Sequence, residues 1–135
     1  MTFEINYLAV LVAAIANMVI GAFWYSPVLF GKKWMALSGI TKEKMGAHPN
    51  MWMYYVAGFI VSLVMSFVLA HVLQLGSTTL SLALQTAFWM WLGFMATISL
   101  NAVIWGGRPK ALWVLDNGYY LVSMLVMSAI LFSWK

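Results

Sequence analysis

The chain has no cysteine, and only three of its 135 residues are Asp or Glu. The absence of cysteine excludes disulfide bonds, thiolate nucleophiles and cysteine-ligated metal sites. Charged residues make up only 7% of the sequence and hydrophobic residues 64%, whereas a soluble domain has about 25% charged residues. No soluble core could bury so much apolar surface, so the composition predicts an integral membrane protein.

Four long apolar runs fill most of the chain. Each has at least the roughly 20 residues that a helix needs to cross a hydrocarbon layer of ~30 Å. We therefore predict an all-α membrane protein with a single domain, residues 1–135, in which four transmembrane helices form an up-down-up-down bundle. The short connections after the second and third runs should make consecutive spans antiparallel neighbours. The predicted spans are residues 5–25, 51–75, 80–105 and 112–134.

Six of the seven basic residues lie in two of the three connections, and the second connection, residues 76–79, has none. Because basic residues stay on the cytoplasmic side, connections 26–50 and 106–111 should be cytoplasmic and both termini outside. The six residues are Lys32, Lys33, Lys42, Lys44, Arg108 and Lys110.

The net charge of +4 does not indicate a nucleic-acid partner. The basic residues flank spans and form no stripe on a folded surface, so they indicate topology and contact with anionic lipid. The expected partner is therefore the lipid bilayer.

The first connection begins with a proline. Pro27 lacks the amide hydrogen that a helix interior needs, so the first span should end near Tyr25. After it, Trp34 and other rings alternate with Lys32 and Lys33, a mixture that suits the headgroup layer. We predict a short interfacial segment between the first two spans.

Small residues recur every four positions on the first two spans. In lipid, helices associate through close packing of such residues. We expect the two rows to pack on each other, and the alternative is packing between protomers. The rows are Ala9, Ala13, Asn17 and Gly21 on the first span, and Gly58, Ser62, Ser66 and Ala70 on the second.

The chain has eight tryptophans, and most lie near the ends of spans, Trp24 and Trp113 among them. This placement is typical of the aromatic belts at the two membrane interfaces. Trp89 and Trp91 lie deeper in the third span. They could stack on a ligand or pigment, or fill gaps between helices.

Polar residues within spans are costly and are the main functional candidates. Asp116 and Asn117 follow the start of the fourth span, and Asn101 and Asn17 come to similar depth from the cytoplasmic side. One interpretation is a pocket that opens to the cytoplasm, with Asp116 as proton acceptor or cation ligand and with Tyr25 or Arg108 at its mouth. The other is structural: Asp116 pairs with Arg108 or Lys110, and each asparagine bonds across a helix pair.

The sequence contains no nucleophile elbow, phosphate-binding loop or carboxylate pair. The two histidines are expected on opposite sides of the membrane, so they cannot share a metal ion. We therefore expect no enzyme activity, no cofactor and no metal site.

Several motifs resemble those of a bacterial family of small four-span integral membrane proteins of unknown function. Residues 21–27 read Gly-Ala-Phe-Trp-Tyr-Ser-Pro and residues 30–34 Phe-Gly-Lys-Lys-Trp; later, residues 107–109 read Gly-Arg-Pro and residues 116–120 Asp-Asn-Gly-Tyr-Tyr. The resemblance implies the four-span topology, a location in the inner membrane of a bacterium, and no particular activity. The family usually has a small residue where this chain has Asn117.

Three functions remain open from the sequence. The first hypothesis is an accessory or self-assembling oligomeric subunit. The alternative is an oligomeric transporter or channel for a small solute or ion, with a polar pocket around Asp116. The third is lipid or pigment binding through Trp89 and Trp91.

Overall fold

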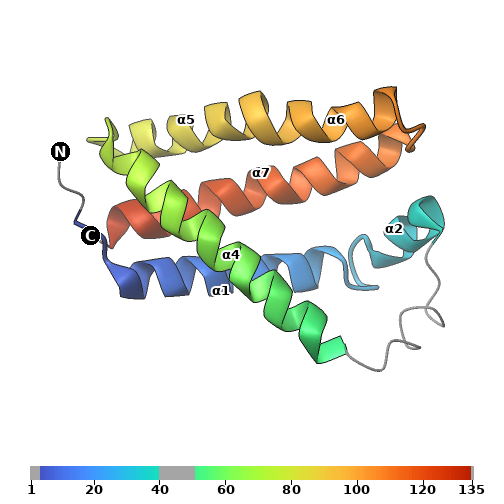
Figure 1. Ribbon diagram of the computed structural model, residues 1–135, viewed down its shortest axis with the longest axis horizontal. Helices are drawn as coiled ribbons and strands as arrows, with labels where there is room; N and C mark the ends of the chain where they lie inside the picture. Colours follow the sequence, from blue (N-terminus) through green and yellow to red (C-terminus); the bar gives the residue numbers. More distant parts are fainter. Residues whose placement is uncertain (1–3, 40–50, 135) are drawn as a thin grey trace.

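The structure is a computed structural model that describes residues 4–39 and 51–134. Within these residues every regular element is a helix (Figure 1). The elements are α1 (Tyr7–Trp24), α2 (Gly31–Ser38), α4 (Met51–Gln74), α5 (Leu80–Met90), the π-helix η1 (Trp91–Ala96), α6 (Thr97–Ile104) and α7 (Lys110–Ser133).

Four helical segments are long and apolar enough to span a membrane: α1, α4, α7 and the continuous run of α5, η1 and α6. The predicted all-α fold with four spans is therefore confirmed. The predicted interfacial segment contains a helix, α2, which ends at Gly39 with a φ of +76°, a conformation that suits glycine. The rest of that segment, residues 40–50, lies outside the described residues.

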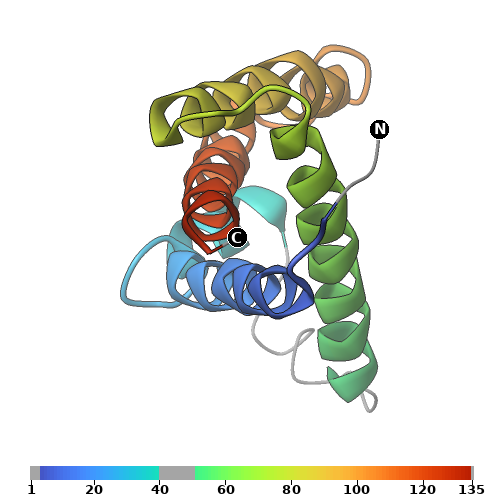
Figure 2. The ribbon, with the colours of Figure 1, turned by 90° about the vertical axis from the view of Figure 1, so that its left-hand side faces the viewer.

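The last span, α7, lies at the centre of the bundle. It packs against α1 and α4 on one side and against α5 and η1 on the other (Figure 2). The turn between α4 and α5 is short, as predicted, but these two helices diverge from it and share almost no contact. The expectation that they are packed neighbours is wrong, because α5 packs against α7 and not against α4.

The two ends of the bundle differ in charge. Both described ends of the chain lie beside the turn between α4 and α5, and α2 lies at the other end with the turn between α6 and α7 (Figure 1). At the first end, the side chain of Gln74 bonds both backbone groups of Glu4, with distances of 3.2 and 2.6 Å. We call the other end the basic end, after its residues Lys32, Lys33, Arg108 and Lys110.

The small-residue rows pack inside one chain. Ala9 and Ala13 are fully buried in α1, and the Ser66 hydroxyl of α4 donates to the backbone carbonyl of Val10, 2.8 Å away. Ser62 and Ala70 are also buried, and Gly58 lies against Met18. Gly21 departs from this row, because it faces Tyr119 of α7. The two rows are thus occupied within the protomer.

Tryptophan side chains connect the third span to α7. The Trp91 indole donates to the backbone carbonyl of Asn117, and the Trp113 indole donates in return to that of Ala96, each at 3.1 Å. Trp113 was expected in an interfacial belt, but its indole points into the bundle. Trp89 is 64% exposed, so it does not share a face with Trp91 as a common stacking site would require.

Candidate functional site

Two of the motifs noted in the sequence interlock at the basic end. A Cβ atom on Gly21 of α1 would lie 3.0 Å from the Tyr119 hydroxyl, and one on Gly118 of α7 would lie 3.0 Å from the Trp24 ring. Each helix therefore has a glycine where the other places an aromatic ring. This reciprocal fit brings the end of α1 close to the third turn of α7.

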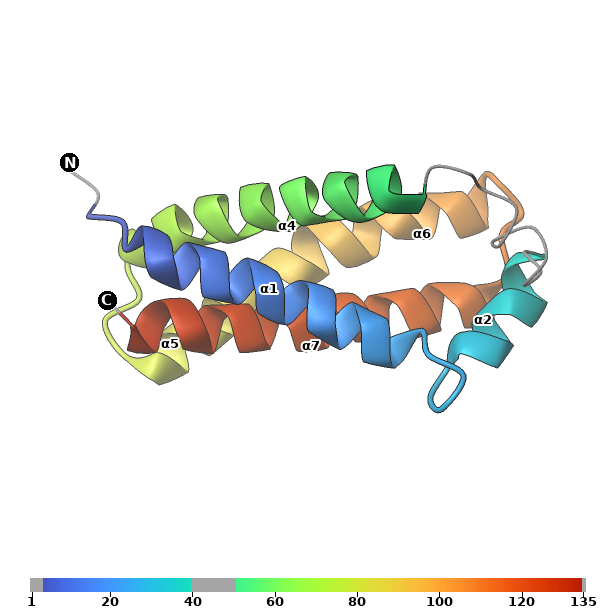
Figure 3. The same cartoon turned by 90° about the horizontal axis from the view of Figure 1, so that it is seen from below.

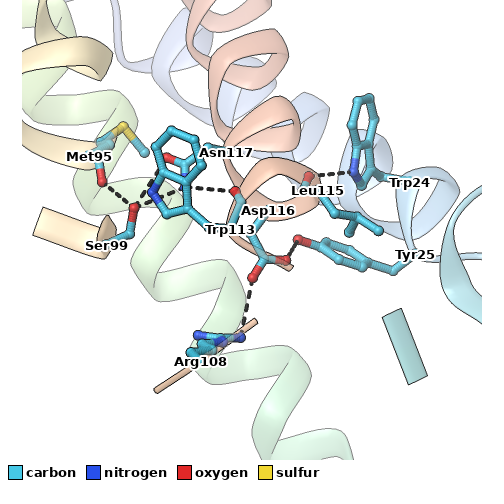
Figure 4. A network of polar contacts seen from close by, with 9 residues as sticks. All are labelled: Trp24, Tyr25, Met95, Ser99, Arg108, Trp113, Leu115, Asp116 and Asn117. Atoms are coloured by element: carbon cyan, nitrogen blue, oxygen red, sulfur yellow. Dashed lines mark hydrogen bonds and ion pairs between the residues drawn. The ribbon is translucent and has the colours of Figure 1, made fainter. Parts of the chain in front are cut away.

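The indole of Trp24 secures this contact, since it donates to the backbone carbonyl of Leu115 at 3.0 Å (Figure 4). The next residue, Tyr25, is thereby directed at Asp116, which also lies on α7. Trp24, expected at the membrane interface, thus has a bundle-facing role as well.

Asp116 accepts hydrogen bonds from two residues. The Tyr25 hydroxyl donates to Oδ1 at 2.6 Å, and Nη2 of Arg108 lies 3.3 Å from Oδ2 (Figure 4). The Asp116 side chain is only 12% exposed, whereas that of Arg108 is 47% exposed. A partly buried acid is therefore held by a tyrosine and by the arginine of the preceding turn.

A tight turn after α1 brings α2 beside the start of α7 (Figure 3). In this turn the amide of Phe30 donates to the Trp24 carbonyl and that of Gly31 to the Ser26 carbonyl. A Cβ atom on Gly31 would lie 2.4 Å from the carbonyl oxygen of Tyr25, so only glycine fits there. The turn fixes the position of α2 relative to Asp116.

Between α2 and α7 lies a hollow of about 590 Å³. On α2, Gly31, Trp34 and Met35 share the face toward it, as their three- and four-residue spacing allows. Lys32 and Lys33 lie on the other face of α2 and are exposed. The lining combines apolar and aromatic groups with one ion pair: Tyr25, Pro27, Gly31, Trp34, Met35, Arg108, Asp116 and Tyr120.

A family model described as "Protein of unknown function (DUF1761)" matches residues 8–132 of the chain. The chain belongs to this family. No curated protein and no solved structure matches it. The expected relationship to a family of unknown function is confirmed, and both interlocking motifs of this DUF1761 chain lie within the matched residues.

Of the six predicted pocket residues, Tyr25, Arg108 and Asp116 line the hollow. Asn101 was expected with them but is exposed on α6. Its side chain has no hydrogen bond to another of the described residues. Asn17 and Asn117 are buried in separate contacts.

Asn17 connects three helices deeper in the bundle. Its Nδ2 donates to the Ser62 hydroxyl of α4 at 2.6 Å, and its Oδ1 accepts from the hydroxyls of Tyr119 and Ser123 of α7. The Ser62 hydroxyl donates in turn to the Gly58 carbonyl. This network joins α1, α4 and α7 beyond the hollow.

Asn117 lies on a different face of α7 from the residues that line the hollow. Its Nδ2 donates to the Ser99 hydroxyl at 2.9 Å and to the Trp113 carbonyl at 3.0 Å, and the residue is 2% exposed. One step along a helix turns a side chain by about 100°, so a neighbour of Asp116 faces another element. Asn117 holds the third span to α7.

The sequence reasoning missed five residues of the hollow. They are Pro27, Gly31, Trp34, Met35 and Tyr120. A helical reading of residues 31–38 would have shown that Gly31, Trp34 and Met35 share one face away from the lysines.

Proposed function

We propose that this DUF1761 chain binds a small amphipathic molecule in the hollow, as the loading step of a small-solute transporter. The observation that carries the proposal is the Asp116–Arg108 ion pair at the edge of an otherwise apolar and aromatic hollow. Ligand pockets are typically apolar with a few placed polar groups. An ion pair in such a lining suits a ligand with one polar group and one apolar part.

The proposed loading side is the cytoplasmic side of a bacterial inner membrane. The basic end carries four of the described basic residues, and positive residues stay on the cytoplasmic side. The hollow lies beside α2, whose exposed lysines would meet the headgroup layer there.

Residues 4–39 and 51–134 of one protomer form the proposed binding site and no passage from it to the other end of the bundle. Beyond the hollow, the Asn17 network and fully buried side chains such as Ala13 and Met127 fill the bundle. Release to the other side therefore needs a second arrangement of the helices or further copies of the chain, as the oligomeric transporter hypothesis requires.

A pair of variants that introduce the same indole ring at adjacent positions tests the hollow. Met35→Trp places the ring in the lining of the hollow and narrows it, whereas Ala36→Trp places the ring on the exposed face of α2. In native mass spectrometry of protein released from detergent micelles, wild type and Ala36→Trp should carry a noncovalent small molecule that Met35→Trp lacks. If Met35→Trp keeps the same adduct, the hollow is not the site.

A second candidate function is the accessory or self-assembling subunit. The third span favours it, because only 11% of its most apolar 18-residue stretch is buried within the protomer, against 44% for that of α7. The small-residue rows no longer support it, since α1, α4 and α7 occupy them. If α6 meets another copy, Ile98→Cys should form a disulfide between chains when an oxidant is added to membranes. Val19→Cys, at another exposed position on α1, should not.

A further inference from the structure

We infer that the polar group of the ligand is an anion, a phosphate or carboxylate, and that Arg108 recognises it. This inference rests on the proposed function, because it concerns the ligand of the same hollow. The rest of the ligand is an alkyl chain that lies against the apolar lining.

The hydrogen-bonding capacity of the ion pair is unequal. Asp116 already accepts one hydrogen bond on each carboxylate oxygen, and its side chain is largely buried. Arg108 has five N–H donors, of which one bond to Asp116 is formed among the described residues, and nearly half of its side chain is exposed. The unused hydrogen-bonding capacity at the hollow therefore lies mainly on the positively charged guanidinium of Arg108.

The net charge around the hollow is positive, like that of Arg108. Among the described residues of the basic end, four are basic and one, Asp116, is acidic, which leaves a net charge of +3. Such a field attracts anions and repels cations. A guanidinium can donate two parallel hydrogen bonds to a planar carboxylate or a tetrahedral phosphate, which an ammonium group does less well.

The apolar part of the ligand has its own surface. The hollow is lined by Trp34 and Met35 of α2, by Tyr120 of α7 and by Pro27 of the turn after α1. The Trp34 ring packs edge-on against Tyr25, with centroids 5.8 Å apart, so the aromatic wall is continuous with the residue that holds Asp116. An alkyl chain along this wall places its anionic end at Arg108.

This chemistry has two possible sources, a membrane phospholipid or a free amphiphile such as a fatty acid. Both place an anion on Arg108 and a chain on Trp34. The experiment below distinguishes them.

Quenching of Trp34 fluorescence by brominated alkyl chains tests the inference directly. Three chains of equal length that end in a carboxylate, an amine or a hydroxyl group are titrated into the purified full-length protein. The Trp34→Phe variant gives the signal of the other tryptophans, which is subtracted. We expect the carboxylate to quench Trp34 at concentrations about ten-fold lower than the other two, since one charge-assisted contact is worth about 1.4 kcal/mol or more.

Two variants that each lose one positive charge separate recognition from general attraction. Arg108→Gln should abolish the preference for the carboxylate, whereas Lys33→Gln, on the exposed face of α2, should keep it. The alcohol should still quench Trp34 in Arg108→Gln, which shows that the hollow is intact. If Arg108→Gln does not fold, the double variant Arg108→Gln/Asp116→Asn leaves no unpaired charge and should give the same loss of preference.

The outcomes separate the two proposals. If the amine or the alcohol quenches Trp34 as well as the carboxylate does, the inference about the anion is wrong and the binding function stands. If no chain quenches Trp34, the binding function itself is wrong. In vesicles, stronger quenching by brominated phosphatidylglycerol than by brominated phosphatidylcholine identifies the anion as a lipid headgroup; equal quenching, with the carboxylate preference present, identifies a free amphiphile.

Discussion

The hydroxyl of Tyr25 lies 2.6 Å from Oδ1 of Asp116, although 91 residues separate the two in the sequence. This distance is typical of an O–H donor on a carboxylate. The other partner of Asp116, Arg108, is nearly half exposed, so solvent weakens the ion pair more than the tyrosine bond. The tyrosine bond therefore holds Asp116 more firmly than the ion pair does, and it connects the end of α1 to α7.

Replacement of this tyrosine by phenylalanine should test that connection. We expect Tyr25→Phe to lower the free energy of unfolding by about 1.5–3 kcal/mol, the range for a hydrogen bond to a charged group. In an Asp116→Asn background the loss should fall to about half, because the acceptor is then neutral. Reversible unfolding in mixed micelles measures both values. Effects that simply add, within about 0.5 kcal/mol, would show that the two residues are not coupled.

Asn17 and Asn101 offer a matched pair for the network beyond the hollow. Asn17 bonds side chains on α4 and α7, whereas Asn101 is exposed. Interhelical hydrogen bonds in membrane bundles average ~0.6 kcal/mol, so loss of three should cost roughly 2 kcal/mol. We expect that loss for Asn17→Ala and a change within about 0.5 kcal/mol for Asn101→Ala. Equal losses for the two variants would contradict the assignment.

The two asparagines also show how much of the structure can be predicted from the sequence. Composition and run length are enough to predict four spans, because the bilayer sets the length of any helix that crosses it. They also give each polar residue a depth, and Asp116, Asn101 and Asn17 were grouped by depth. Depth does not say which way a side chain points, and Asn101 and Asn117 face away from the hollow for that reason.

The prediction for the tryptophans was limited for the same reason, because position along a span does not say which way an indole points. Trp24 and Trp113 lie near span ends, which is typical of interfacial belts, but their indoles donate to carbonyls of neighbouring helices.

The divergence of α4 and α5 could not be predicted either, since a short turn fixes the distance between two helix ends and leaves the angle between the helices free. The contact between residues 21–25 and 115–119 required the tertiary structure, although both motifs were noticeable in the sequence.

Ser128 provides a test with the opposite sign. Its hydroxyl is the one buried side-chain polar atom without a hydrogen-bond partner among the described residues. An unpaired buried hydroxyl costs free energy, so Ser128→Ala should be neutral or raise the free energy of unfolding by up to about 1 kcal/mol. Ser123→Ala, which removes the bond to Asn17, should lower it. The same unfolding assay compares the two, and a Ser128→Ala protein less stable than Ser123→Ala would contradict this reading.

The orientation can be measured with unusual clarity, because the chain has no cysteine of its own. Thr78→Cys lies in the exposed turn between α4 and α5, and Lys110→Cys at the exposed start of α7. In intact cells that express the protein, a membrane-impermeant maleimide should label Thr78→Cys and leave Lys110→Cys unlabelled until the membrane is opened. The reverse pattern would place the basic end, and the hollow with it, outside.

Gly31 carries the sharpest prediction for the hollow. A methyl group there would lie 2.4 Å from the Tyr25 carbonyl oxygen, so Gly31→Ala must shift the turn that holds α2 beside α7. We expect a loss of about 1–3 kcal/mol in unfolding free energy, as overpacking usually costs, together with loss of Trp34 quenching by the brominated carboxylate. Gly93→Ala is the matched control, because a Cβ atom there meets nothing within 4 Å. It should keep both stability and quenching. If Gly31→Ala lost stability but still bound the carboxylate normally, α2 would not be needed for binding, and the ligand would have to contact α7 alone.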